Sequence, residues 1–232
     1  MERLLIKFTK NDEVKFISHL DTMRTIHRSL RRAGLPVSYS QGFNPHPSIS
    51  VAAPLSLGLS SIGEYADIDF DFYVEEKEVI RILNEKLPFG MRVLSAIYIK
   101  EKKISAMAAV NGAKYTLRMK HNNISMVECK SYLNDILLQE EILKMKRSKK
   151  GPKETNVRPL ILDLSVTGYN EEEVEIDAFI MAGSNGSLSI DMLTSIISDF
   201  SQDKIKGYNC LMRRNIYTKQ ADKWIDLLSF YK

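Results

Sequence analysis

The chain has 232 residues, 44% of them hydrophobic and 27% charged, which is typical of a globular protein with one large domain or two smaller ones. No apolar run is long enough to span a membrane and the first residues lack a signal-peptide pattern, so we expect a cytoplasmic protein with no membrane partner. The net charge of +4 permits nucleic-acid binding without indicating it, so support for such a function has to come from the local arrangement of charges.

The first hundred residues predict a β-α-β-β-α-β order. Alternation of apolar and polar residues over 4–9 predicts a strand, and Ser18 with Asp21 matches the pattern that caps a helix start. That helix is expected over 18–33, because Gly34 and Pro36 end it. Short extended segments at 37–40 and 48–53, a strand at 65–72, a helix at 75–87 and a strand at 92–100 follow.

The second half predicts a looser copy of the same order. The expected elements are a strand at 114–120, a helix at 125–138, a strand at 142–147, a hairpin of 160–167 and 174–181, a helix at 189–200 and a strand at 211–217. Residues 220–231 have the apolar spacing of a C-terminal amphipathic helix. We therefore predict an α+β fold of two tandem ferredoxin-like (βαββαβ) subdomains, residues 1–105 and 112–232.

The first predicted helix has an apolar side and a basic side. At 100° per residue, Arg24, Arg28, Arg31 and Arg32 fall opposite the apolar stripe that contains Ile26. Four guanidinium groups so close together repel one another, and a phosphate backbone would relieve that repulsion. The alternative is a solvated helix face, or pairing of these arginines with Asp67, Asp69 and Asp71.

The segment 38–47, which follows the helix, carries no charged side chain apart from its histidine. Tyr39 and Phe43 could stack on unstacked bases, and the amides of Gln41 and Asn44 could bond base edges. The alternative is a turn-rich connection whose aromatic rings fill the core. The absence of Asp, Glu, Lys and Arg suggests that the loop is partly buried or packed over another surface.

Three of the four histidines lie in this region. His19 in the first helical turn and His46 in the loop are the candidate catalytic residues, since two histidines can act as base and acid around one phosphodiester. His27 falls at the border of the apolar and arginine faces, where either a binding or a structural role is possible.

The sequence offers no metal or cofactor site. Cys129 and Cys210 are too few and too far apart for an iron–sulfur cluster or a disulfide framework, and both are expected to be buried or partly buried thiols. Asp67, Asp69 and Asp71 alternate on a strand, roughly 6.5–7 Å apart, which suits a single metal poorly. Basic residues crowd 144–153, and Arg158 stands alone at the start of a predicted strand as a further candidate binding residue.

Residues 16–58, FISHLDTMRTIHRSLRRAGLPVSYSQGFNPHPSISVAAPLSLG, resemble the signature of an uncharacterised bacterial family known as the radical-SAM-linked proteins. In that family the domain occurs alone or behind a B12-binding radical SAM enzyme, and this chain resembles the stand-alone form. VRPLI at 157–161 resembles the second motif of the family, with Thr155 and Asn156 in the place of the acidic residue that leads that motif. The element order is also similar to that of the RAMP proteins, which bind and cut CRISPR RNA, so a RAMP-like arrangement of the two subdomains is expected.

These observations favour an accessory protein that binds RNA, for example tRNA or rRNA, and presents it to a radical SAM partner or another RNA-modifying enzyme. One alternative is a metal-independent RNA-processing enzyme that uses His19 and His46. The other is a protein-interaction module that docks its arginine helix on an acidic partner. The first and third hypotheses imply no catalysis by the chain on its own.

Overall fold

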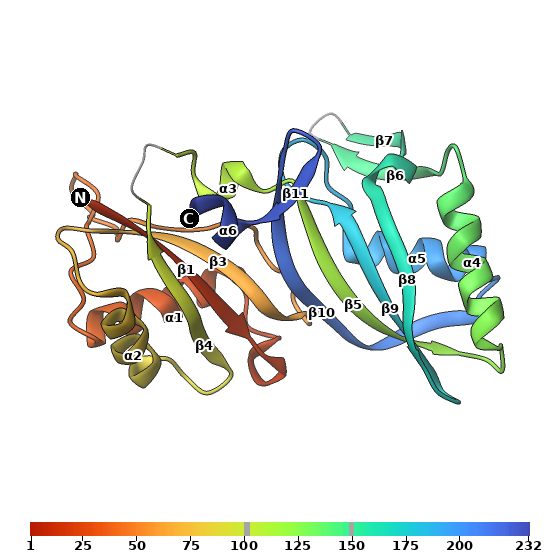
Figure 1. Cartoon of the computed structure of the whole chain (residues 1–232), viewed down its shortest axis with the longest axis horizontal. Helices are drawn as coiled ribbons and strands as arrows, with labels where there is room; N and C mark the ends of the chain where they lie inside the picture. Colours follow the sequence, from red (N-terminus) through yellow and green to blue (C-terminus); the bar gives the residue numbers. More distant parts are fainter. Residues whose placement is uncertain (100–102, 149–150) are drawn as a thin grey trace. The chain divides into compact units, whose positions relative to one another are not determined.

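The structure is a computed structural model that describes residues 1–99, 103–148 and 151–232, and the side chains of all of these except residues 147 and 148. The chain has a mixed α+β fold in which the strands pair mostly antiparallel. It divides into two compact units (Figure 1): unit 1 contains Met1–Asn111 and Met212–Lys232, and unit 2 contains Gly112–Leu211.

Unit 1 follows the order β-α-β-β-α-β. Its elements are β1 (Glu2–Lys10), the short 3-10 helix η1 (Asp12–Val14), α1 (His19–Arg32), β2 (Ile49–Val51), β3 (Ser60–Phe70), α2 (Glu76–Lys86) and β4 (Met91–Tyr98). β1 pairs antiparallel with β4 and β3, and β2 pairs antiparallel with β3. The strands therefore lie in the order β4-β1-β3-β2, and α1 and α2 contact each other.

The main core of unit 1 lies between this sheet and the two helices. Leu4, Ile6 and Phe8 alternate along β1, so their side chains point to one face of the sheet and pack with Ile26 and Leu30 of α1. All five are buried. The apolar stripe predicted for the first helix is therefore the face that α1 presents to the core.

The second face of the unit 1 sheet is covered as well. Two short helices, α3 (Ala106–Ala109) and α6 (Leu227–Tyr231), contribute residues that contact this face. Asp67 of β3 accepts hydrogen bonds from the Ala106 amide and the Arg3 guanidinium, both at 2.8 Å, and that guanidinium lies 5.7 Å from the centre of the Tyr231 ring. Residues 212–232 thus belong to unit 1, whereas the predicted division places them in the second domain.

The predicted C-terminal helix over 220–231 is wrong. β11 (Lys223–Asp226) turns back at Ala221 and pairs antiparallel with the end of β10 (Ile205–Gln220), which leaves only α6 as helix. The spacing of Trp224, Leu227 and Tyr231 suits a helix, but a strand pairing that satisfies the backbone donors and acceptors of residues 223–226 prevails over it.

A buried ion pair holds β10 beside β3. Arg213 Nε donates to Glu64 Oε1 at 2.7 Å and Arg213 Nη2 donates to Glu64 Oε2 at 2.5 Å. Both side chains are 3% exposed. The same guanidinium donates to the carbonyl oxygens of Ala53 (2.8 Å) and Pro54 (3.3 Å), so one side chain joins three segments of unit 1.

Gly63 allows the backbones of β3 and β10 to approach closely. A Cβ at this position would lie 2.3 Å from the Arg214 carbonyl oxygen and 2.7 Å from the Asn215 Cα. Backbone atoms cannot yield as a flexible side chain can, so the close approach requires glycine here.

Unit 2 is built around four strands and two helices, with an inserted hairpin. Its elements are β5 (Gly112–His121), α4 (Met126–Leu138), the hairpin β6 (Leu143–Ser148) and β7 (Gly151–Asn156), the 3-10 helix η2 (Arg158–Leu160), β8 (Ile161–Tyr169), β9 (Glu173–Met181), α5 (Ile190–Phe200) and β10 up to Leu211. β9 pairs antiparallel with β5 and β8, whereas β6 and β7 form a separate two-stranded sheet.

The interior of unit 2 is apolar and holds one cysteine. Leu117, Leu133, Ile176 and Ile196 are fully or almost fully buried. Burial raises the pKa of the Cys129 thiol to about 11, so this thiol stays protonated near neutral pH. Cys129 and the half-buried Cys210 are both free thiols, as predicted. No helix in residues 1–99, 103–148 and 151–232 is long and apolar enough to cross a membrane.

Replacing Arg213 with Met should lower the free energy of unfolding by about 3–5 kcal/mol, because Glu64 would keep a buried charge without its partner. Urea denaturation followed by circular dichroism measures this decrease. Arg81→Met is the matched control, since Arg81 forms exposed pairs with Glu78 and Glu85 and its removal should leave the unfolding midpoint nearly unchanged.

The double variant Glu64→Leu/Arg213→Met should recover much of that stability, because it removes both charges from the interior together. An Arg213→Met protein as stable as the wild type would show that the pair does not hold residues 212–232 in place.

Candidate functional site

α1 is a well-capped amphipathic helix with one exposed side. The Ser18 Oγ accepts a hydrogen bond from the Asp21 amide at 3.1 Å, and the Ser18 hydroxyl donates to Asp21 Oδ2 at 2.7 Å. Hydrogen bonds from Ser18 and Arg24 lower the pKa of the Asp21 carboxyl. The predicted start of the helix is confirmed.

The four arginines of α1 have different environments. Arg24 pairs with Asp21 at 3.0 Å in an exposed contact. Arg32 donates to the Lys86 carbonyl oxygen at 2.9 Å and to Ser29 Oγ at 3.2 Å. The Ser29 hydroxyl donates to the same carbonyl at 3.0 Å, so both side chains bond the C-terminal end of α2. Arg28 and Arg31 are exposed and have no hydrogen-bond or ion-pair partner among the described residues. Arg28 is close enough to attract the Asp21 carboxylate electrostatically, but of the four arginines it and Arg31 are the two without a bonded partner among the described residues.

The aspartates at the end of β3 and just after it do not neutralise the α1 arginines. Asp67 is bonded to Arg3 and the Ala106 amide. Asp71 Oδ1 accepts from the Ser38 hydroxyl at 2.6 Å, and Asp69 Oδ2 accepts from the Ser48 hydroxyl. The possibility of pairing with the arginine helix, left open by the sequence, is therefore excluded.

The serine–aspartate bonds fix the base of the loop that follows α1. Ser38 N donates to Asp69 O at 2.8 Å, Ser48 N donates to Ser38 O at 2.8 Å, and Asp69 N donates to Ser48 O at 3.0 Å. Higher in the loop, Ser40 N donates to His46 O at 2.8 Å and His46 N donates to Ser40 Oγ at 2.9 Å. The loop is thus attached to the end of β3 by both backbone and side-chain bonds.

The upper part of the loop is open to solvent, in contrast to the expected partial burial. Residues 39–46 are all exposed, and Phe43 is as exposed as a free side chain at 108%. The aromatic rings of this loop therefore do not fill the core. Ser40 and His46 exchange one backbone bond and one bond to the Ser40 hydroxyl, and solvent can satisfy the remaining backbone polar groups of an exposed loop.

The loop meets α1 at His27. His27 Nε2 lies 3.4 Å from the Tyr39 hydroxyl, and the two rings make an edge contact with centroids 6.2 Å apart. Partial burial lowers the pKa of His27, and the positive charges of Arg31 and Arg28 and the nearby His46 lower it further. We name the exposed and half-exposed residues of this region the α1–loop surface; it comprises Arg24, His27, Arg28, Arg31, Tyr39, Gln41, Phe43, Asn44 and His46.

His19 lies elsewhere on unit 1. It lines a cavity of about 10 Å³ with Lys10, Thr22, Glu64 and apolar residues. Such a volume holds at most about one water molecule. No described interaction joins His19 to His46, and the histidine that His46 affects electrostatically is His27. The structure thus does not bring the two candidate catalytic residues together.

Lys10 is a structural residue that we did not single out from the sequence. Its side chain is almost fully buried, and Nζ donates to the carbonyl oxygens of Lys15 (3.1 Å) and Ile17 (2.9 Å). Burial lowers its pKa. These bonds hold the segment that leads into α1. The sequence did contain a signal that Lys10 is buried, because Lys10 continues the alternation of Leu4, Ile6 and Phe8 on the core side.

Arg158 belongs to unit 2 and contacts backbone carbonyls. Its guanidinium donates to Leu137 O at 2.5 Å and to Ile161 O at 2.7 Å. The first of these bonds gives a donor to a backbone carbonyl in the last turn of α4. A binding role for Arg158 remains a prediction. In the basic segment 144–153, Lys144 pairs with Asp199 and Lys146 donates to Ser187 O, whereas the side chains of 147–150 lie outside the described residues.

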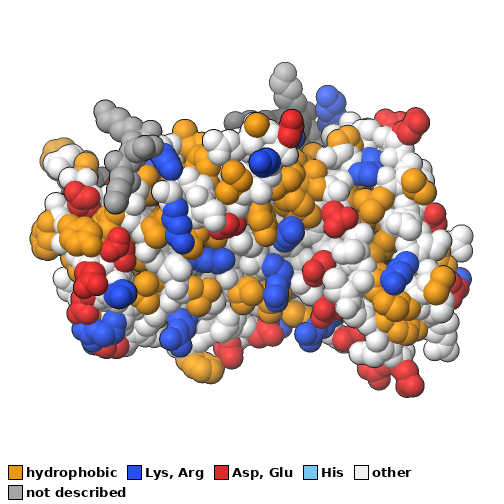
Figure 2. Space-filling view, viewed as in Figure 1, with side chains coloured by type: hydrophobic (Ala, Val, Ile, Leu, Met, Phe, Trp, Pro, Cys, Tyr) orange, Lys and Arg blue, Asp and Glu red, His pale blue; other side chains and the backbone are white. Residues whose placement is uncertain are grey.

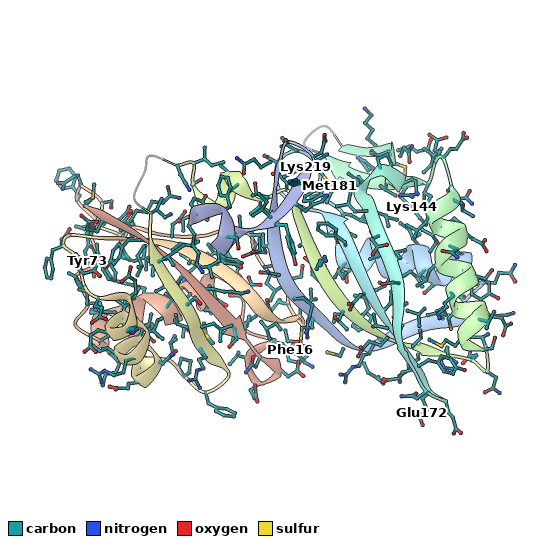
Figure 3. All side chains as sticks on the ribbon, viewed as in Figure 1. Phe16, Tyr73, Lys144, Glu172, Met181 and Lys219 are labelled. Atoms are coloured by element: carbon teal, nitrogen blue, oxygen red, sulfur yellow. The ribbon has the colours of Figure 1, made fainter. Side chains whose placement is uncertain are left out.

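The surface of unit 2 includes an acidic region, in contrast to the cationic α1–loop surface. Acidic side chains gather at the tip of the β8–β9 hairpin of unit 2 (Figure 2, lower right), where Glu172 is labelled in Figure 3. Within the described residues, no group of three or more His, Cys, Asp or Glu side chains is placed to hold a metal ion.

The fold and this surface define the chain as a mixed α+β protein with a cationic helix beside a fixed, exposed aromatic loop. The chain belongs to a bacterial family described as "Uncharacterized protein conserved in bacteria (DUF2344)", whose profile matches residues 3–190. No match was found among curated proteins.

Two solved structures are similar over most of the chain. The crystal structure of a Cbf5-Nop10-Gar1 complex matches with a TM-score of 0.51 at 10% identity, covering 92% of this chain and 48% of the other. The structure of an H/ACA RNP bound to a substrate RNA containing 2'-deoxyuridine matches with a TM-score of 0.49 at 11% identity, covering 90% and 46%. This chain spans about half the length of these solved chains, and the likeness to the first shows a shared fold alone.

Replacing Arg31 with Gln should raise the pKa of His27, because one of the positive charges that disfavour its imidazolium form is removed. Proton NMR of the histidine Hε1 resonances across a pH titration measures this change in pKa. Arg24→Gln is the matched control: Arg24 lies on the same helix but pairs with Asp21 and does not contribute to the shift of His27. Equal shifts in both variants would contradict the assigned geometry.

The double variant Ser38→Ala/Ser48→Ala should loosen the loop, because it removes both hydroxyl donors to Asp71 and Asp69. Amide hydrogen exchange of residues 38–48 should become faster while exchange in β1 is unchanged. Ser56→Ala, which removes an exposed hydroxyl of the same unit, should leave exchange in the loop as it is.

Proposed function

We propose that this chain is an RNA-binding accessory protein, built from two tandem ferredoxin-like subdomains, that presents RNA to an RNA-modifying enzyme. The observation that carries the proposal is the state of Arg28 and Arg31. Both are exposed beside a fixed aromatic loop, and neither has a partner among the described residues. Guanidinium groups in this state fork readily onto phosphate oxygens.

The surroundings of these arginines support an anionic partner. Asp67, Asp69 and Asp71 are bonded to Arg3, Ser48 and Ser38, and none of them forms an ion pair with an α1 arginine among the described residues. Asp21 is the acid of the same helix, and it is engaged by Ser18 and Arg24. The histidine that feels the charges of Arg28 and Arg31 is His27, a side chain that is neutral or cationic but never anionic.

The loop supports RNA over a simple anion. Phosphate alone would be bound by the arginines without help from Tyr39 and Phe43. Exposed rings beside cationic side chains are the combination found where proteins bind splayed-out bases. The amides of Gln41 and Asn44, each both donor and acceptor, suit base edges in the same way.

The resemblance of residues 16–58 to the radical-SAM-linked family supports a radical SAM enzyme as the modifying partner. In this proposal the chain supplies RNA binding and the partner supplies the chemistry.

Arg28→Ala/Arg31→Ala should weaken RNA binding by tenfold or more at low salt. The slope of log K against log salt should fall by about 1 for each phosphate group that the variant no longer neutralises. Fluorescence anisotropy with a labelled tRNA or rRNA fragment measures both quantities. Lys120→Ala/Lys130→Ala removes the same charge from exposed positions of unit 2 and serves as the control.

Two results would refute the proposal. One is absence of RNA binding at low salt, and the other is an equal effect of the two double variants. Pull-down from lysate with and without nuclease separates RNA from an acidic protein partner. Cleavage of total RNA that is abolished in His19→Ala would instead favour an RNA-processing enzyme.

A further inference from the structure

One exposed aromatic ring, that of Phe43, makes no packing contribution to the described fold. Phe43 is exposed over its whole side chain at the tip of the loop, and no ring or cation contact among the described residues involves it. An exposed phenyl group is unfavourable in water. The base of the loop, by contrast, is held by the bonds of Ser38 and Ser48 to β3. The ring is therefore carried on a fixed support.

A strip of side chains on α1 leads towards that loop. Leu20, Arg24, His27 and Arg31 fall within a narrow sector of the helix, because positions three, four, seven and eleven residues apart return to the same side. From Leu20 to Arg31 the strip extends about 16 Å at roughly 1.5 Å per residue. Its C-terminal end meets the loop where His27 lies 3.4 Å from the Tyr39 hydroxyl.

The N-terminal end of the strip is apolar. Leu20 is 64% exposed, and Phe16, which lies between η1 and α1 (Figure 3), is 74% exposed. Lys15 Nζ lies 5.6 Å from the centre of the Phe16 ring. Helix α1 thus carries its arginines between an apolar N-terminal end and the aromatic loop that follows its C-terminal end.

We propose that the α1–loop surface binds an unpaired segment of RNA, with one base stacked on Phe43 and the phosphates of adjoining nucleotides against Arg31, Arg28 and Arg24. Inside a duplex both faces of every base are covered by neighbouring base pairs, so away from the duplex ends the Phe43 ring can stack only on an unpaired base. A cationic track combined with aromatic platforms is how proteins hold single strands. This inference rests on the proposed function and narrows it to unpaired RNA.

The test compares three probes by fluorescence anisotropy: a labelled single-stranded RNA, the blunt duplex that it forms with its complement, and a labelled poly-glutamate peptide. The single strand should bind at least tenfold more tightly than the duplex. Phe43→Ala should weaken single-strand binding about tenfold, the effect of removing one base stack, and should leave duplex binding unchanged.

Two further variants test whether the effect is specific to an aromatic ring at position 43. Phe89→Ala removes a ring of similar exposure, 84%, from the turn between α2 and β4 and should have no effect. Phe43→Trp should bind the single strand as tightly as the wild type or more tightly, because a larger ring stacks at least as well.

The outcomes distinguish this inference from the proposed function. If the duplex binds as tightly as the single strand and Phe43→Ala has no effect, while Arg28→Ala/Arg31→Ala weakens both, the inference is overturned and RNA binding stands. Binding of poly-glutamate without binding of either RNA overturns both and identifies an acidic protein partner.

Discussion

The buried pair of Arg213 and Glu64 is the interaction on which unit 1 depends. It joins side chains that are 149 positions apart in sequence and makes residues 212–232 part of the N-terminal unit. A buried ion pair adds little net stability, since both charged groups lose their hydration. It does make the packing of these two segments specific, because either charge buried without its partner would be strongly destabilising. β3 carries Glu64 near its start and Asp69 near its end, and Asp71 directly follows it, so one strand and the residue after it hold both the C-terminal segment and the loop that follows α1.

Arginine has several distinct roles in this chain, and the difference lies in what each guanidinium can reach. Arg213 is desolvated and fully bonded to Glu64 and to backbone carbonyls. Arg32 and Arg158 donate to free carbonyls at helix ends, which need donors in any environment. Arg28 and Arg31 have no such partner among the described residues, and after partial burial their charges are a further cause of the lowered pKa of His27. The candidate site is therefore the part of the basic helix that the fold leaves unpaired.

Much of the secondary structure follows from local pattern. The start of α1 at Ser18, its apolar stripe and the order of elements in residues 1–98 are visible in the sequence, because capping and periodicity involve residues within a few positions of one another. Contacts between distant residues could not be predicted in the same way. The acceptors of Arg32 and Arg158 are backbone carbonyls with no sequence signature, and the Ser38–Asp71 and Ser48–Asp69 bonds exist only because the loop returns to the end of β3.

The sequence by itself determined that α1 would carry a line of arginines opposite an apolar stripe, and that an aromatic, uncharged segment would follow it. Those properties depend only on residue type and on the 3.6-residue period of the helix. The tertiary structure alone decided which arginines stay unpaired, that the loop is exposed and fixed, and that His46 lies near His27 and not near His19. The reason is that pairing, burial and pKa depend on what surrounds a side chain in space, and those neighbours come from β3, α2 and the chain terminus.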